Sequence, residues 1–250
     1  MSYVVRANTA LPKTKAWRVN QPEISAEEQR RRTIPTRRAE ISWLEDGQPL
    51  TRNAVVPALP LFQDALSAFA QGTLIQTPDG KVAVEDLQPG MKVSTAEGPA
   101  HPIRWIGSMT VLPNSPELNL PELKLFRVTD GGYGLERSAP DLLLGPAARI
   151  LPGILATNSS SPLRNIADMA DGSSVIEIKP MSPVRVFHIA LDAHRLLRAN
   201  GLLAESYHPG ANSRLYVSRE MYEIFLKLFP HLDNEGGFGI QAHQRGSEAA

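Results

Sequence analysis

Between Gly72 and about Pro209 the apolar residues occur in short runs, and turn-forming residues separate each run from the next. In the clearest case, residues 73–77 and 81–84 flank a Pro-Asp-Gly turn at 78–80. Proline presets φ, aspartate bonds to its own backbone and glycine accepts a positive φ, so the segment is predicted to be a β-hairpin. Amphipathic helices between the runs are missing, which disfavours parallel βαβ units. We therefore expect an all-β domain.

Further strands are predicted from alternation and apolar content. The longest candidate is 184–191, and residues 103–107 and 124–129 alternate between apolar and polar positions. No internal repeat is visible, which disfavours solenoids and propellers. Shorter strand candidates lie at 91–95, 142–144, 149–151, 196–197 and 202–204.

Composition excludes several classes of function. The 26 basic and 26 acidic residues cancel, so no overall charge favours nucleic acid or an anionic membrane. The chain has no cysteine, which excludes disulfides, thiolate zinc sites and cysteine nucleophiles. No apolar run approaches the roughly 18 residues of a membrane span, and a secretory signal pattern is missing. We expect a soluble, cytoplasmic protein, with signal-independent secretion left open.

Residues 1–60 differ in character from the rest, with ten cations against six anions. We interpret them as a basic, partly disordered N-terminal arm. Its arginine run is either solvated or a contact for nucleic acid or an acidic partner, although no stacking aromatic residues interleave with it. The run contains Arg30, Arg31, Arg32, Arg37 and Arg38.

One amphipathic helix is predicted near the C-terminus, within residues 215–232. Ser218 is a suitable N-cap, and the apolar residues that follow have helical spacing. The apolar stripe either packs on the β-domain or docks a partner; it consists of Met221, Ile224, Phe225 and Leu228. The remaining residues, 233–250, are rich in Gly, Gln and Ser, and we expect them to be disordered.

Three blocks follow one another along the chain: Ala-Phe-Ala-Gln-Gly-Thr-Leu-Ile at 68–75, and the segments 141–151 and 186–207. Together they resemble the Hint module that inteins and Hedgehog autoprocessing domains share, and in particular its bacterial stand-alone branch. The resemblance covers roughly residues 66–214. It implies a compact, horseshoe-like, all-β Hint disc, to which the N-terminal arm and the C-terminal helix are added.

The resemblance also implies a lost activity. Family members typically begin with a cysteine, the nucleophile of an N-to-S acyl shift, where this chain has Ala68. The family's assisting histidine ends a Ser-Pro-x-His or Thr-x-x-His motif. The matching segment runs from Gly145 to Ala148, with alanine at the histidine position. Two complementary losses indicate that the activity has decayed.

The third block keeps His188, Asp192 and His194. These are either survivors of the active-site lining or groups that hold a turn and bond across the sheet. If the strand continued that far, all three would share one face, so they also suggest a metal site.

Two sequence features would allow an activity to persist. Ser67 adjoins Ala68 and would be a displaced nucleophile, with His194 as its base. Asn212-Ser213 resembles a splice junction, although Ala211 stands where inteins usually carry histidine. We expect a catalytically inactive Hint-domain protein that acts as a scaffold or protein-interaction module, with no cofactor and an unidentified protein partner. The rival is an autoprocessing enzyme that cleaves itself or transfers an acyl group through Ser67 and His194.

Overall fold

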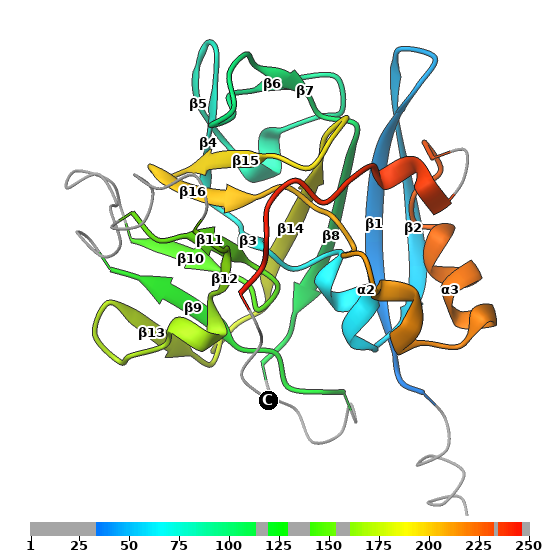
Figure 1. Cartoon of the computed structure of the whole chain (residues 1–250). Coiled ribbons are helices and arrows are strands. Elements are labelled where there is room, and N and C mark those ends of the chain that lie inside the picture. Colours follow the sequence, from blue (N-terminus) through cyan, green and yellow to red (C-terminus); the bar gives the residue numbers. More distant parts are fainter. Residues whose placement is uncertain (1–33, 114–119, 130–140, 154–160, 233–234, 247–250) are drawn as a thin grey trace, which may run out of the picture. The chain divides into compact units, whose positions relative to one another are not determined.

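The computed structural model describes residues 34–113, 120–129, 141–153, 161–232 and 235–246. Every helix and strand named below belongs to the unit Pro35–Ala250. Its strands form three antiparallel sheets, so the expected all-β class is confirmed (Figure 1). None of the described helices is long and apolar enough to cross a membrane.

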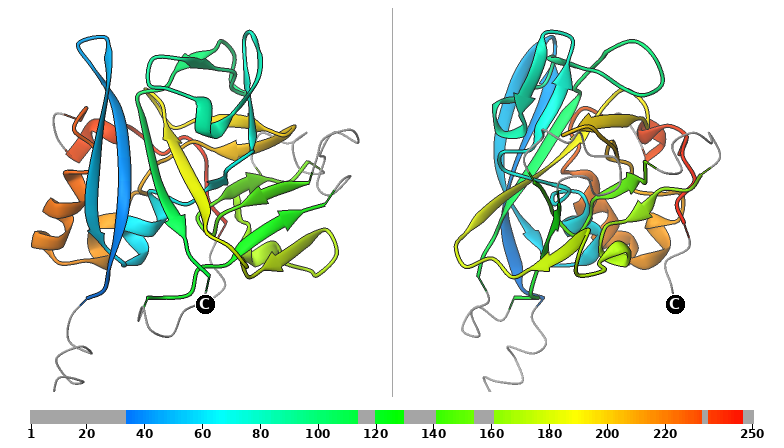
Figure 2. Two further views of the ribbon diagram at one scale, coloured as in Figure 1. Left: turned by 180° about the vertical axis from the view of Figure 1, so that it is seen from behind. Right: turned by 90° about the vertical axis from the view of Figure 1, so that its left-hand side faces the viewer.

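The largest sheet has eight strands, and a two-residue strand lies in its middle. Figure 2 shows from behind that β8 and β14 run side by side, and they pair over seven residues. The strand order is β13 (Val175–Ile178), β9 (Leu125–Val128), β10 (Leu142–Leu144), β3 (Phe69–Ala70), β14 (Val184–Ala190), β8 (Trp105–Val111), β1 (Thr36–Glu45) and β2 (Gln48–Pro57).

A six-stranded sheet and a small pair of strands complete the β-structure. The predicted hairpin at 73–84 is confirmed as β4 and β5, with Thr77 opposite Gly80 at the turn. The six strands are ordered β12 (Arg164–Asn165), β11 (Arg149–Leu151), β16 (Leu202–Glu205), β15 (Leu196–Ala199), β4 (Leu74–Thr77) and β5 (Gly80–Ala83). The pair consists of β6 (Lys92–Val93) and β7 (His101–Pro102).

Helices are short and lie between or after the strands. The α-helices are α2 (Pro60–Asp64) and α3 (Arg219–Leu226), and the 3₁₀ helices are η1 (Val84–Asp86), η4 (Ala167–Met169), η5 (Ser213–Tyr216) and η6 (Glu235–Phe238). Two large apolar clusters form the core. One contains β3, β10, β11 and β14 residues, and the other lies among β1, β8, α2 and α3.

The predicted boundary of the basic, partly disordered arm at residue 60 is wrong, because residues 36–57 form β1 and β2 of the β-domain. The alternating side chains of β1 enter the core, with Ile41 fully buried. Asp46 and Gly47 join the strands with φ of 50° and 77°, the backbone that a two-residue hairpin loop requires. The Asp46-Gly47 turn signal of this hairpin was therefore overlooked, because the arginines of the region suggested a solvated arm.

The arginine run is divided by the same hairpin. Arg37 lies in β1, is only 7% exposed and donates from its guanidinium to the carbonyl of Pro121. Its side chain is therefore not available to nucleic acid. Arg38 is exposed on the same strand, and Arg30, Arg31 and Arg32 lie outside the described residues.

The C-terminal helix is present but shorter than predicted. Ser218 caps α3 as expected, with its side chain accepting from the amide of Met221 at 3.2 Å. Phe225 is fully buried, so the helix packs on the β-domain, whereas Ile224 is 36% exposed and lies outside the buried stripe. Trp105 of β8 donates its indole N–H to the carbonyl of Leu228 at 2.6 Å.

The prediction of a disordered tail over 233–250 is wrong for residues 235–246. They form η6 and then an extended segment, residues 239–246, that crosses the domain (Figure 1, red). We call residues 239–246 the C-terminal strap. The polar composition that suggested disorder instead supplies the hydrogen bonds that hold this segment, as shown below.

Replacing Phe225 by alanine is expected to lower the free energy of unfolding by about 3–5 kcal/mol, because it leaves a cavity among packed aromatic rings. Phe225 contacts the rings of Phe62, Tyr222 and Phe229. The half-exposed neighbour Ile224 is the matched control, and Ile224→Ala should cost less than about 1 kcal/mol. Urea unfolding followed by circular dichroism measures both. Equal, small losses would contradict a structural role for α3.

Candidate functional site

The peptide bond between Ser67 and Ala68 is buried and hydrogen-bonded on both sides. The amide of Ala68 donates to the carbonyl of Phe187 in β14 at 2.9 Å. The carbonyl of Ala68 accepts from the amide of Gly145 at 2.8 Å, and that of Ser67 accepts from the amide of Ala147 at 3.1 Å. The residues on either side of this bond are at most 1% exposed.

The structure brings the first two sequence blocks together at this bond. The turn from Gly145 to Ala148 joins β10 to β11 and wraps around the Ser67–Ala68 peptide. Ala68 and Ala148 belong to the same apolar cluster, and each is 1% exposed. A Cβ atom on Gly145 would lie 2.1 Å from the carbonyl oxygen of Ser67, so only glycine fits there. The site is therefore lined by methyl groups and backbone.

His188 lies in β14 beside this peptide, in an apolar setting. Its Nδ1–H donates to the carbonyl of Asp64 at 2.8 Å, and its ring meets those of Phe69 and Tyr207 edge-on. Burial lowers the pKa of His188 to about 4, and the hydrogen bond to Asp64 opposes that shift. The imidazole is therefore neutral at neutral pH.

His194 belongs to a buried ionic network rather than to the Ser67–Ala68 site. Its Nε2–H donates to Oε1 of Glu205 at 2.8 Å. Its Nδ1 accepts two amide N–H groups of the C-terminal strap, from Ala242 at 3.0 Å and His243 at 3.3 Å. These contacts fix one tautomer, with the proton on Nε2.

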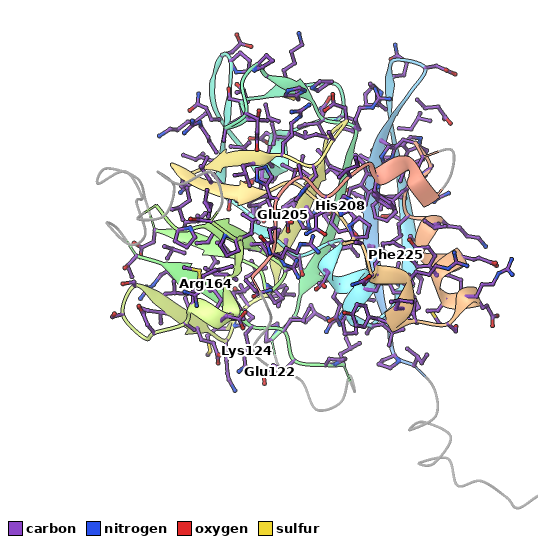
Figure 3. All side chains as sticks on the ribbon, in the orientation of Figure 1. Glu122, Lys124, Arg164, Glu205, His208 and Phe225 are labelled. Carbon is purple, nitrogen blue, oxygen red and sulfur yellow. The ribbon has the colours of Figure 1, made fainter. Side chains whose placement is uncertain are left out.

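Glu205 is the centre of this network and is 1% exposed. Arg245 of the strap donates through Nε to Oε1 at 2.9 Å, and Arg149 lies 3.7 Å from Oε2. Burial raises the pKa of Glu205, but the hydrogen bond from His194 and the two arginines outweigh it and lower the pKa to about 2. The glutamate is therefore ionised. Figure 3 marks Glu205 and His208, which both contact Arg245.

Asp192 is half-exposed and points elsewhere. One carboxylate oxygen lies 3.3 Å from Nδ1 of His101, and the other lies 3.5 Å from Nε of Arg195. The metal site suggested for His188, Asp192 and His194 is wrong, because each contacts a different partner. Strand β14 ends at Ala190, so the assumed shared face does not extend that far. Within the described ranges, no three His, Cys, Asp or Glu residues are grouped to hold a metal.

The hydroxyl of Ser67, the suggested nucleophile, forms a hydrogen bond with a nearby residue of the chain. Its hydroxyl donates to the carbonyl of Gln63 at 2.7 Å, and its side chain is fully buried. Both ring nitrogens of His194 have partners described above. The hydroxyl and its supposed base are therefore held by other groups.

A polar cavity of about 1060 Å³ lies beside the network. Asp64, Arg149, Asn212 and Arg245 border it, so it is reached by α2, β11 and the strap as well as by the supposed splice junction. Sequence reasoning assigned no role to Glu205, Arg149 or Arg245. The signal for Glu205 was a charged residue at the end of an apolar strand, but nothing local indicated that an arginine 40 residues later would reach it.

Comparison with known proteins gives the following findings. A family model described as "Hint domain" matches residues 67–211. No curated protein matches the chain. Among solved structures, the chain is similar to the solution structure of a bacterial intein-like domain from Clostridium thermocellum, at 14% sequence identity and a TM-score of 0.41. That alignment covers 57% of this chain and 99% of the other.

Gly145→Ser is expected to lower the free energy of unfolding by about 1–3 kcal/mol, because the new side chain overlaps the Ser67 carbonyl and forces the backbone apart. The matched control is Gly246→Ser, where a Cβ meets nothing closer than 3.4 Å. Thermal unfolding by calorimetry separates the two. A Gly145→Ser variant as stable as the control would show that the turn yields easily.

The free energy of unfolding should also decrease as the pH is lowered, in two overlapping pH ranges. The unfolded chain binds a proton at His188 from about pH 6.5 downward, and the folded chain only near pH 4. For Glu205 the corresponding pH range runs from 4.5, the pKa in the unfolded chain, down to about 2, the pKa in the folded chain. In both windows the unfolded state binds more protons, so acidification destabilises the fold, by up to about 3 kcal/mol for each group. His231, with its pKa lowered by burial to about 4, adds to the first window.

Urea unfolding at several pH values measures this dependence. His188→Gln keeps a donor for the Asp64 carbonyl but removes the titration, so its stability should change less between pH 6.5 and 4 than that of the unmodified protein. An unchanged slope in the variant would contradict the assignment.

Proposed function

Because this chain belongs to the Hint domain family, we propose that its β-domain is a catalytically inactive member that serves as a scaffold or protein-interaction module. Ala68 and Ala148 occupy the positions that the family resemblance assigns to the nucleophile and the assisting histidine. A methyl group neither attacks a carbonyl nor transfers a proton. The amide that would leave in an acyl shift, that of Ala68, donates instead to the carbonyl of Phe187.

One structural observation carries the proposal: the chain upstream of Ala68 is built into the same fold as the chain downstream. Strand β1 pairs with β8 from Ala39 opposite Met109 to Trp43 opposite Trp105. Helix α2 contributes the fully buried Phe62 to the core shared with β8 and α3. A self-processing domain must detach or transfer its upstream segment, whereas here that segment completes the sheet and the core.

The catalytic positions are replaced while the β-fold is kept, and this combination favours an interaction role. The fold retains buried polar groups, above all the ionised Glu205, that a purely structural core of this size would replace by apolar side chains without penalty. Groups of this kind are useful where they meet a partner. The rival proposal, acyl transfer through Ser67 and His194, would require both side chains to leave their present partners.

Intact-mass measurement tests the proposal. The purified full-length chain, incubated with hydroxylamine or a thiol, should remain one species of 27.3 kDa. An acyl shift to Ser67 would place the Leu66 acyl group on the serine oxygen as an ester, which hydroxylamine cleaves. Ser67→Ala is the matched control and should also give a single species, lighter than the unmodified chain by one oxygen atom. A fragment ending at Leu66 that disappears in Ser67→Ala would overturn the inactive assignment.

A further inference from the structure

The C-terminal strap lies on the domain as an added strand. It forms a parallel bridge with Leu163, the residue directly before the edge strand β12. The amide of Leu163 donates to the carbonyl of Gln244 at 2.8 Å, and the amide of Gly246 donates to the carbonyl of Leu163 at 2.7 Å. Pairing of an extended segment with a sheet edge is a general mode of peptide recognition.

Side chains of the domain recognise the strap as well. Nδ1 of His194 accepts the two successive amides of Ala242 and His243. The guanidinium of Arg245 donates through Nε to Glu205 and through NH2 to the carbonyl of His208, at 2.9 and 2.6 Å. The domain thus presents main-chain acceptors and a carboxylate to an extended segment with one arginine.

A further hydrogen bond secures the strap at its exposed side. Nε2 of His243 lies 2.6 Å from Oε1 of Glu97, in the loop before β7. Both side chains are about one quarter exposed, so this hydrogen bond competes with water and adds little free energy. The receiving surface therefore carries two carboxylates and suits a basic segment.

The strap is held almost entirely by polar contacts. Among residues 237–246 no side chain is buried, and Ile240 is 88% exposed. A segment with few buried apolar contacts exposes little apolar surface when it opens, so the main cost of opening is the loss of its hydrogen bonds and of the Arg245 contact with Glu205. The strap can leave its groove without disrupting the apolar core.

The strap does not use the full hydrogen-bonding capacity of the Glu205 carboxylate, its main partner in the domain. Oε1 of Glu205 receives both the His194 and the Arg245 hydrogen bonds, while Oε2 is buried without a hydrogen bond and has the Arg149 guanidinium 3.7 Å away. Arginine matches a carboxylate best through two parallel N–H···O bonds. Arg245 uses only one, because its NH2 group is turned to His208. An arginine presented from another backbone position can engage both oxygens.

We propose that the groove formed by Leu163, His194, Glu205 and the His208 carbonyl is a peptide-binding site for an extended, arginine-containing segment of a partner protein. The C-terminal strap occupies this site in cis and competes with that partner. The strap also forms a wall of the polar cavity, through Arg245 and Gly246, so its departure would widen the groove. This inference rests on the proposed interaction function and names its site and the chemistry of its partner.

Binding of a labelled peptide tests the site. The probe is the sequence of residues 239–246, Gly-Ile-Gln-Ala-His-Gln-Arg-Gly, carrying a fluorophore, and binding is followed by anisotropy. A tethered strap acts at a high effective concentration, so full-length Arg245→Ala should bind the probe at least about tenfold more tightly than the unmodified chain. A probe with alanine for its arginine should bind that variant at least about tenfold more weakly. Arg219→Ala, at an arginine whose side chain is 84% exposed on α3, is the matched control and should behave like the unmodified chain.

A second measurement does not depend on any variant. In the unmodified chain, saturating probe should displace the strap and speed hydrogen exchange at the amides of Ala242 and His243, while the alanine probe should not. The proposal is overturned if folded Arg245→Ala does not bind the probe, or if both probes bind or displace the strap equally. Either failure would leave the inactive assignment intact, because that depends on the intact mass alone.

Discussion

The large sheet is continuous only through β3, a strand of two residues, and the rest of the architecture depends on how that strand is held. On one side Phe69 and Ala70 pair with β14, and on the other Phe69 pairs with Leu144 of β10. The three backbone hydrogen bonds around the Ser67–Ala68 peptide extend this junction. The Ser67–Ala68 peptide is thus fixed between β14 and the turn that follows β10, directly before the strand that joins the two halves of this sheet.

Local sequence predicted those parts of the fold whose causes are local. The Pro-Asp-Gly turn at 78–80 fixed a hairpin, and Ser218 marked the start of α3, because both act on neighbouring residues. The hairpin of β1 and β2 was missed because its arginines suggested a solvated arm, although Asp46-Gly47 is a strong turn signal. The strap could not have been found, since its partners lie 31 to 146 residues away along the chain.

The candidate site was likewise predicted in part from the sequence and missed in part. The family resemblance assigned Ala68 and Ala148 to the nucleophile and histidine positions, and the structure places both residues in one apolar cluster. The alternation of side chains along a β-strand gave the wrong positions for Asp192 and His194, because β14 ends before them. Their partners are set by tertiary contacts, which bring a buried glutamate, two arginines and the strap together around His194. Hydrogen bonds and opposite charges therefore hold this part of the domain together.

The contact between Gly145 and the Ser67 carbonyl has an evolutionary consequence. Once the backbone has closed to a distance at which a Cβ would lie 2.1 Å from that oxygen, a larger residue at 145 can return only if the turn moves first. That movement would break the hydrogen bonds of Gly145 and Ala147 with the Ser67–Ala68 peptide. Glycine at this position is therefore entrenched. Substitutions at the surface of this protein can therefore accumulate far more freely than any change at this turn.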